Sequence, residues 1–211
     1  LGSDGGFHGT VIDTQGALDA IVWQDPRRLY AEAGVSCAKV ARTAARAGQC
    51  GLEFLAGIPG TLGGALAMNA GAHGGETWER VASVRTIDRS GVIHERAPGE
   101  YTVGYRSVTG PSNEWFIEAT LRFDPEVKPS KEAMDEMLER RKRTQPLGLP
   151  SCGSVFRNPP GDHAARLIEA AGLKGFSIGG AEVSATEVGW VHAVVLAVSV
   201  PVLASFAVLE I

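Results

Sequence analysis

The sequence predicts an α+β fold, because hairpin-like strands and separate amphipathic helices alternate irregularly along the chain. Residues 20–23 (AIVW) and 29–33 (LYAEA) flank the turn Asp25-Pro26, which is typical of a strand pair. Residues 37–47 instead carry apolar side chains at helical spacing. The 211 residues are enough to bury a substantial core, in one large domain or two modest ones.

The first elements are a strand at 10–12, the strand pair, and the helix at 37–47. Ser36 is a good N-cap for this helix, and Gly48 would end it. Its buried face is expected to consist of Val40, Ala44 and Ala47.

The later elements are read in the same way. A hairpin over 88–90 and a half-buried strand at 115–123 should follow, and the hairpin strands are 81–87 and 91–95. One helix is expected from Ser130 to about Arg143, and a second is expected at 164–171. Inward-facing side chains in the second helix should be Leu167 and Ile168.

A domain boundary is expected at 124–129, where two prolines and several charged residues separate clear elements. The predicted domains are therefore 1–123 and 124–211.

The stretch 188–209 has no formally charged residue and is long enough to span a membrane. Pro201 and His192 interrupt it, and no basic cluster flanks it. A buried helix followed by a strand at 206–209 is the favoured interpretation, and a membrane span is the alternative.

Composition excludes several classes of function. A formal net charge of -4 and a pI of about 5.8 give no electrostatic basis for nucleic-acid binding. Three cysteines without CxxC spacing predict neither a disulfide framework nor a metal site, and they fit a reducing compartment. No signal peptide pattern is seen, so a cytoplasmic protein is expected, with a monomer favoured.

Residues 57–75, here called the glycine segment, are the most informative part of the sequence. Seven of the nineteen are glycine and none is Asp, Glu, Lys or Arg. Glycine lets a ligand lie directly against the backbone, and backbone amides in such a loop could bind phosphate or a flat ring system. A glycine-rich crossover within a sheet is an equally good interpretation of the composition alone.

The order of residues from Leu55 to Ala72 (LAGIPGTLGGALAMNAGA) closely resembles the flavin-binding segment of UDP-N-acetylenolpyruvoylglucosamine reductases. Residues 104–107 (GYRS) resemble the family's GYRxS segment, and 153–159 (GSVFRNP) its GSxFxNP segment. Residues 167–184 resemble the stretch that follows. The similarity covers residues 1–184 in the family's order, and four spaced motifs are far more specific than one glycine loop.

The resemblance implies a flavin-binding domain of the vanillyl-alcohol-oxidase-like type at 1–123 and a smaller α+β substrate domain at 124–211. It implies FAD as cofactor, NADPH as hydride donor and a UDP-sugar as small-molecule substrate. The reaction would reduce UDP-N-acetylglucosamine enolpyruvate to UDP-N-acetylmuramate for peptidoglycan synthesis, by hydride transfer from flavin N5 and protonation by a serine. The alternatives are another flavin oxidoreductase of this fold and a catalytically silent FAD- or nucleotide-binding module.

The resemblance also implies roles for residues. Arg106 would stabilise the negative charge that develops on the substrate carboxylate, and Ser154 would donate the proton. Glu210 is a weak candidate for the family's C-terminal glutamate. The implied cofactor-binding residues are Gly57, Ile58, Pro59, Gly60, Thr61, Gly63, Gly64, Asn69, Ala70 and Gly71. The implied substrate-binding residues are Tyr105, Asn158 and, more weakly, Lys142.

The sequence departs from the family at both ends. It passes from Leu1-Gly2 directly to residues 3–7 without a GGGSN-type phosphate loop, and it ends Leu209-Glu210-Ile211 instead of in an EPEV-like strand. The N-terminal flavin subdomain and some loop segments are therefore expected to be missing from this sequence.

Overall fold

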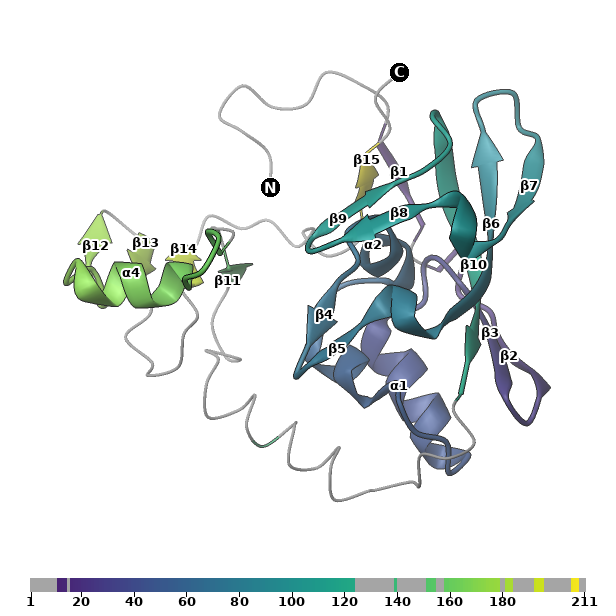
Figure 1. Ribbon diagram of the computed structural model, residues 1–211, viewed down its shortest axis with the longest axis horizontal. Helices are drawn as coiled ribbons and strands as arrows, with labels where there is room; N and C mark the ends of the chain where they lie inside the picture. The colour runs from purple at the N-terminus through teal and green to yellow at the C-terminus, as the bar shows by residue number, and fades with distance from the viewer. Residues whose placement is uncertain are drawn as a thin grey trace. The chain divides into compact units, whose positions relative to one another are not determined.

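The computed structural model describes residues 11–14, 16–123, 139, 151–154, 158–178, 181–183, 192–195 and 206–208 (Figure 1). These residues belong to two compact units. The larger unit contains 11–123 and 206–208, and the smaller one contains the described residues from 139 to 195. The boundary predicted at 124 lies outside the described residues and stays a prediction.

The larger unit is built on a five-stranded antiparallel sheet of order β2-β3-β10-β6-β7. Two hairpins, β2–β3 and β6–β7, contribute its edges, and β10 pairs with β3 on one side and β6 on the other. The strands are β2 (Ile21–Asp25), β3 (Arg28–Glu32), β6 (Val81–Asp88), β7 (Ile93–Arg96) and β10 (Glu114–Arg122). All five predicted strands are confirmed, including the turn at Asp25-Pro26.

One face of this sheet is covered by α1 (Cys37–Arg46), the 3₁₀ helix η1 (Glu53–Gly57) and α2 (Leu62–Ala67). Ser36 is the predicted N-cap of α1, and its Oγ accepts a hydrogen bond from the Lys39 backbone N–H at 3.2 Å. The predicted buried face is correct at Val40 and Ala44 but wrong at Ala47, which is exposed. The helix ends at Arg46 and Gly48 turns the chain away with φ +70°, so Ala47 lies past the buried turn.

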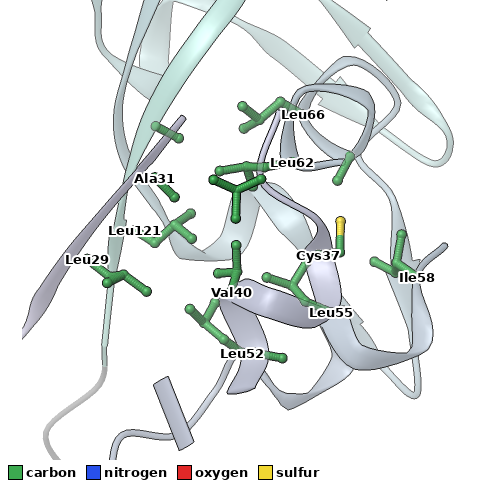
Figure 2. Close-up of a cluster of buried hydrophobic side chains, with 14 of the residues drawn as sticks. Leu29, Ala31, Cys37, Val40, Leu52, Leu55, Ile58, Leu62, Leu66 and Leu121 are labelled. Atoms are coloured by element: carbon green, nitrogen blue, oxygen red, sulfur yellow. The ribbon is translucent and has the colours of Figure 1, made fainter. Parts of the chain in front are cut away.

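The core lies between the sheet and these helices. Figure 2 shows aliphatic side chains of the sheet and of the helical segments gathered there, and none of those named next is more than 1% exposed. They are Leu29, Ala31, Val40, Leu52, Leu55, Leu62, Leu66 and Leu121. Each fully buried leucine contributes about 1.5–3 kcal/mol relative to an exposed one. The glycine segment, which includes α2, is therefore anchored on a rigid base.

Two small hairpins follow α2 in the chain. The first pairs β4 (Gly71–Ala72) with β5 (Gly75–Glu76) and runs into the 3₁₀ helix η2 (Thr77–Arg80). The second follows the 3₁₀ helix η3 (Pro98–Glu100) and pairs β8 (Thr102–Gly104) with β9 (Ser107–Thr109). Helix α2 contacts β9, as the crossing of the β8–β9 hairpin over α2 in Figure 1 indicates.

A separate two-stranded sheet joins sequence-distant parts of the larger unit. Strand β1 (Val11–Asp13) pairs in antiparallel fashion with β15 (Phe206–Val208), with Val11 opposite Val208. The strand predicted at the N-terminal end is thus confirmed at Val11 and Ile12, and the strand predicted at 206–209 is confirmed at 206–208.

The described residues of the smaller unit include a four-stranded antiparallel sheet of order β11-β14-β13-β12 and the helix α4 (Ala164–Ala170). Its strands are β11 (Ser151–Ser154), β12 (Ser177–Ile178), β13 (Ala181–Val183) and β14 (His192–Val195). The helix predicted at 164–171 is confirmed. The prediction that Leu167 faces inward is wrong, because Leu167 is 42% exposed and Ala165 is the buried residue. Ile168, one turn from Ala165, shares that face.

The prediction of a buried helix in the C-terminal apolar stretch is wrong at 192–195, which form β14. A short apolar run with adjacent valines fits a buried strand as well as a helix, and periodicity alone cannot separate the two. The helix predicted from Ser130 to Arg143 lies outside the described residues, apart from Glu139. In the part of the chain that the structure describes, no helix has both the length and the apolar character to cross a bilayer.

Candidate functional site

The glycine segment begins with a sharp turn that attaches it to the start of α1. Gly60 has φ +105°, a conformation that glycine adopts without strain, and Pro59 precedes it on the surface. The carbonyl oxygen of Gly60 accepts a hydrogen bond from the Cys37 backbone N–H at 3.0 Å. Thr61 forms an isolated bridge with Ser36. The turn is therefore fixed by backbone contacts with the protein itself.

The first amides of α2 are also used by the protein. The Leu62 N–H donates to the Val35 carbonyl at 2.8 Å, and the Gly63 N–H donates to the Ala33 carbonyl at 2.9 Å. A Cβ on Gly63 would lie 3.0 Å from the Cβ of Ala33. These two amides are not available to a ligand, and Gly63 is needed for close packing against the chain that follows β3.

Gly64 has different surroundings. It is exposed, and a Cβ built on it would meet nothing closer than Thr61 Oγ1 at 3.9 Å. Ala67 and Met68, three and four residues later, are exposed on the same side of α2, and Met68 is 48% exposed. This uncharged surface of small side chains and one methionine, here called the α2 face, gives a flat ligand room to approach the backbone.

Three of the predicted cofactor-binding residues are buried in the protein interior. Ile58 is 8% exposed, Ala70 is 6% exposed and Asn69 is 2% exposed. Gly71 is half-buried in β4, and a Cβ there would lie 2.7 Å from the Gly75 carbonyl oxygen. Gly57 likewise packs closely, since a Cβ on it would lie 3.0 Å from Nε2 of His73. Ile58, Asn69 and Ala70 thus point into the protein, and Gly57 and Gly71 leave no room for a side chain.

Asn69 makes three side-chain hydrogen bonds. Its Oδ1 accepts from the Trp78 backbone N–H at 3.1 Å. Its Nδ2 donates to Glu76 Oε2 at 2.7 Å and to the Gly104 carbonyl oxygen at 3.2 Å. Glu76 and Trp78 are hydrogen-bond partners of Asn69 that the sequence did not reveal. The only polar side chain between Leu62 and Ala72 was the available signal, since asparagine tolerates the left-handed backbone that Asn69 adopts at φ +43°.

The β8–β9 hairpin brings Arg106 to the glycine segment. Tyr105 and Arg106 form its two-residue turn between the paired residues Gly104 and Ser107. Arg106 Nη2 lies 3.5 Å from the Gly71 carbonyl oxygen, and its Cζ lies 6.0 Å from the ring centroid of Tyr105, which is 54% exposed. Two predicted site elements that are separated in sequence are thus adjacent in the fold.

Left-handed backbone is concentrated in this region. Among the described non-glycine residues, φ is positive at Asn69, His73, Arg106 and Asn113. Such a conformation is uncommon outside glycine, costs about 1–3 kcal/mol for most side chains, and is often found at functional sites. Three of the four residues belong to the glycine segment or to the Arg106 turn.

The remaining predicted residues lie in the smaller unit or outside the described part of the chain. Ser154 ends β11 and pairs with His192 of β14, and its side chain is not among those described. Asn158 is exposed, and its Oδ1 accepts a hydrogen bond from the Ala164 backbone N–H at 3.0 Å at the start of α4. Lys142 and Glu210 lie outside the described residues.

A cavity of about 270 Å³ lies elsewhere, on the sheet face opposite the helices. Its polar groups satisfy one another: the Tyr30 hydroxyl donates to Glu118 Oε2 at 2.8 Å, and Arg85 Nη1 pairs with Glu118 Oε1 at 3.1 Å. Burial and the hydrogen bond to Glu118 raise the pKa of Tyr30. We do not assign this cavity to the site, because neither the glycine segment nor the β8–β9 hairpin lines it.

Comparison with known families agrees with the geometry. Residues 1–96 match the family of FAD binding domains, and residues 145–197 match the C-terminal domain of UDP-N-acetylenolpyruvoylglucosamine reductase. The fold is that of an FAD-binding α+β protein, which confirms the predicted fold class. A crystal structure of UDP-N-acetylenolpyruvylglucosamine reductase from Thermus caldophilus aligns with a TM-score of 0.67 at 34% identity, over 81% of this chain and 62% of that one.

Curated relatives point to the same family. The UDP-N-acetylenolpyruvoylglucosamine reductase of Alkalilimnicola ehrlichii is 58% identical over 182 residues, which are 86% of this chain and 61% of the relative. That of Methylococcus capsulatus is 57% identical over 182 residues, which are 86% of this chain and 60% of the relative. Over the matched residues the chain is similar to UDP-N-acetylenolpyruvoylglucosamine reductases, and it spans about three fifths of the length of these relatives.

Proposed function

We propose that this protein is an FAD-dependent oxidoreductase that reduces the enolpyruvyl group of UDP-N-acetylglucosamine enolpyruvate to give UDP-N-acetylmuramate, with NADPH as the source of hydride. The observation that carries the proposal is the placement of Arg106, a permanent cation, against the glycine segment of an FAD-binding fold. The names of the relatives support the substrate, which is a precursor of peptidoglycan.

The α2 face is the surface on which we place the flavin. Bound flavin would supply the hydride for the reduction. Gly64 would allow the ring system to lie against the backbone, while Ala67 and Met68 would contact it without introducing charge. Pro59, Gly60 and Thr61 would flank this contact at the start of α2. Buried residues of the segment, among them Ile58, Asn69 and Ala70, would hold the backbone in place.

Arg106 would bind the substrate carboxylate, where negative charge accumulates as hydride is accepted. The guanidinium group stays charged at any physiological pH, and its planar fork matches the two carboxylate oxygens. A donor fixed before the reaction starts stabilises the transition state without reorganisation. The tight two-residue turn that carries Arg106 provides such fixation. Tyr105, exposed beside it, would stack against the substrate or hydrogen-bond to it.

Residues 153–159 would supply the proton and contacts with the substrate. Ser154 would act as general acid toward C2 of the enolpyruvyl group. Asn158 already accepts a hydrogen bond through Oδ1, so a contact with the substrate would use its Nδ2 group. Lys142 would act as a point charge toward the diphosphate, and Glu210 stays a weaker proposal for a second catalytic group.

The proposal is tested with the purified protein in two steps. The visible spectrum, recorded with and without added FAD, should show the absorption of protein-bound flavin. NADPH oxidation should then depend on added UDP-N-acetylglucosamine enolpyruvate. A protein that binds no flavin under either condition would overturn the cofactor assignment. A flavoprotein whose NADPH oxidation ignores this substrate would instead be a different oxidoreductase or a silent binding module.

A further inference from the structure

The three hydrogen bonds of Asn69 use its full amide in a position closed to solvent. The residue is 2% exposed and lies between the end of α2 and the start of β4. The Trp78 N–H needs an acceptor there, while Glu76 and the Gly104 carbonyl need donors. All three partners are satisfied only by a side chain as long as asparagine that carries one acceptor and two donors. These partners also fix the orientation of the Asn69 amide, with Oδ1 toward Trp78 and Nδ2 toward Glu76 and Gly104.

One of these bonds reaches the base of the Arg106 turn. Gly104 directly precedes Tyr105 and Arg106, and it pairs with Ser107, which follows them. Its carbonyl oxygen is the acceptor for Asn69 Nδ2, 35 residues earlier in the chain. The Arg106 guanidinium in turn lies 3.5 Å from the carbonyl of Gly71, two residues after Asn69. The turn is therefore connected to the same short stretch at its base and at its tip.

We propose that Asn69, oriented by Glu76, is a positioning residue that sets the place of the Arg106 guanidinium relative to the glycine segment. It does not contact the cofactor, because its amide is buried and fully engaged with the protein. The expected effect of Asn69 on kcat rests on the proposed function. The structural connection between Asn69 and the turn stands without it.

The variant Asn69→Gly tests the connection most directly. Glycine keeps the left-handed backbone at φ +43° without strain, so the losses are confined to the side chain's hydrogen bonds and its packing. Asn113→Gly is the matched control, since Asn113 has φ +59° but is exposed. We expect a fall in kcat of about 10- to 100-fold for Asn69→Gly, with flavin content retained, and no change for Asn113→Gly, because loosening a charge stabiliser affects the transition state first.

A double-mutant cycle separates positioning from a general loss of structure. If Asn69 acts through the guanidinium, Asn69→Gly should lower kcat much less in an Arg106→Lys background than in the wild-type background. An equal fold-loss in both backgrounds would overturn the proposal. Loss of flavin in step with loss of activity would also overturn it, since Asn69 would then serve the cofactor.

Hydrogen exchange gives a readout that needs no activity. Backbone amides of 102–109 should exchange faster in Asn69→Gly than in wild type, and at the wild-type rate in Asn113→Gly. If exchange in the hairpin is unchanged, the positioning role is wrong even where the enzyme is active. Faster exchange in a protein that lacks substrate-dependent NADPH oxidation would support the connection and reject the proposed function alone.

If Asn69→Gly does not fold, a second variant keeps the test available. The double substitution Asn69→Asp with Glu76→Gln exchanges donor and acceptor between the two side chains and conserves the local charge. It can retain their mutual hydrogen bond and the acceptor for Trp78, but it removes the donor to Gly104. Wild-type kcat and hairpin exchange in this variant would overturn the proposal.

Discussion

The Cβ of Ala33 would lie 3.0 Å from a Cβ built on Gly63, so these two residues pack with no room for a side chain between them. The next residue, Gly64, faces open space. The two adjacent positions of this motif are therefore occupied by glycine for different reasons. One is required by packing inside the protein, and the other is not required by any contact among the described residues.

This difference gives the first prediction. Gly64→Val should purify without bound flavin while it keeps the melting temperature of the wild-type apoprotein, because the new side chain extends into the space proposed for the ring and contacts little of the protein. The ratio of visible to ultraviolet absorbance and a thermal melt measure the two effects. A yellow Gly64→Val protein with wild-type flavin stoichiometry would contradict the placement of the flavin on the α2 face.

The neighbouring substitution serves as the contrast. Gly63→Val should lower the free energy of unfolding by about 1–3 kcal/mol, the usual effect of adding volume to a packed interior. Urea unfolding of the apoprotein, monitored by tryptophan fluorescence, measures this without reference to flavin. Equal stability of the two variants would show that the contact with Ala33 relaxes at no cost.

The second prediction concerns Arg106. Arg106→Lys keeps the charge but loses the planar fork, so kcat should fall by about 10²- to 10³-fold with flavin content unchanged. Steady-state kinetics with saturating NADPH would measure the change. Arg122→Lys, at the exposed end of β10, is the matched control and should retain wild-type turnover. Near-wild-type turnover of Arg106→Lys would exclude a bidentate role.

The third prediction concerns Tyr101, whose hydroxyl is buried without a hydrogen-bond partner among the described residues. Its ring packs on Trp78 and Phe116, with centroids 4.6 and 5.6 Å away. Burial, reinforced by the negative charge of Glu114, raises the pKa of Tyr101 to about 12. In the unfolded chain the pKa of tyrosine is about 10, so Tyr101 does not lower the free energy of unfolding through ionisation below that pH. As the pH rises from about 10 toward 12, the unfolded chain loses the proton first, and the free energy of unfolding falls.

Tyr101→Phe should therefore be at least as stable as wild type at pH 7 and should lose less stability in alkali. Removing the hydroxyl leaves the ring contacts in place and eliminates a buried group that costs about 1–3 kcal/mol when unpaired. Urea midpoints of both proteins at pH 8 and pH 11 would measure the effect. Parallel alkaline losses in the two proteins would show that Tyr101 does not contribute to them.

Local sequence signals were sufficient for much of this fold. The cap at Ser36, the stop at Gly48 and the turn at Asp25-Pro26 depend on neighbouring residues, and all three were predicted. The prediction for 192–195 was wrong because a short apolar stretch takes its conformation from its strand partners, here β11 and β13.

In the candidate site, too, local motifs could be predicted from the sequence and contacts between distant residues could not. The glycine segment and the GYRS turn could be recognised by their motifs, but the contacts between them could not. Asn69 obtains its partners from 7, 9 and 35 residues along the chain, and only the folded structure brings those groups together. Composition likewise could not show that Gly63 serves packing while Gly64 remains open.

The last prediction concerns Ser154, at the end of β11 opposite His192. As proton donor to the substrate it should not affect the reduction of bound flavin by NADPH. Ser154→Ala should leave that half-reaction near its wild-type rate and slow the reoxidation by UDP-N-acetylglucosamine enolpyruvate about 10²- to 10⁴-fold, the range of general acid catalysis. Stopped-flow absorbance of the flavin follows the two half-reactions separately.

Ser151→Ala is the matched control for this experiment, because Ser151 begins the same strand and pairs with Val194 of β14. It removes a hydroxyl from β11 without touching the proposed donor, so both half-reactions should keep their wild-type rates. If Ser154→Ala slows both halves equally, the substitution acts on the fold or on flavin binding. If it slows neither, the proton comes from another group, because loss of an essential general acid must appear in the half-reaction that consumes the proton.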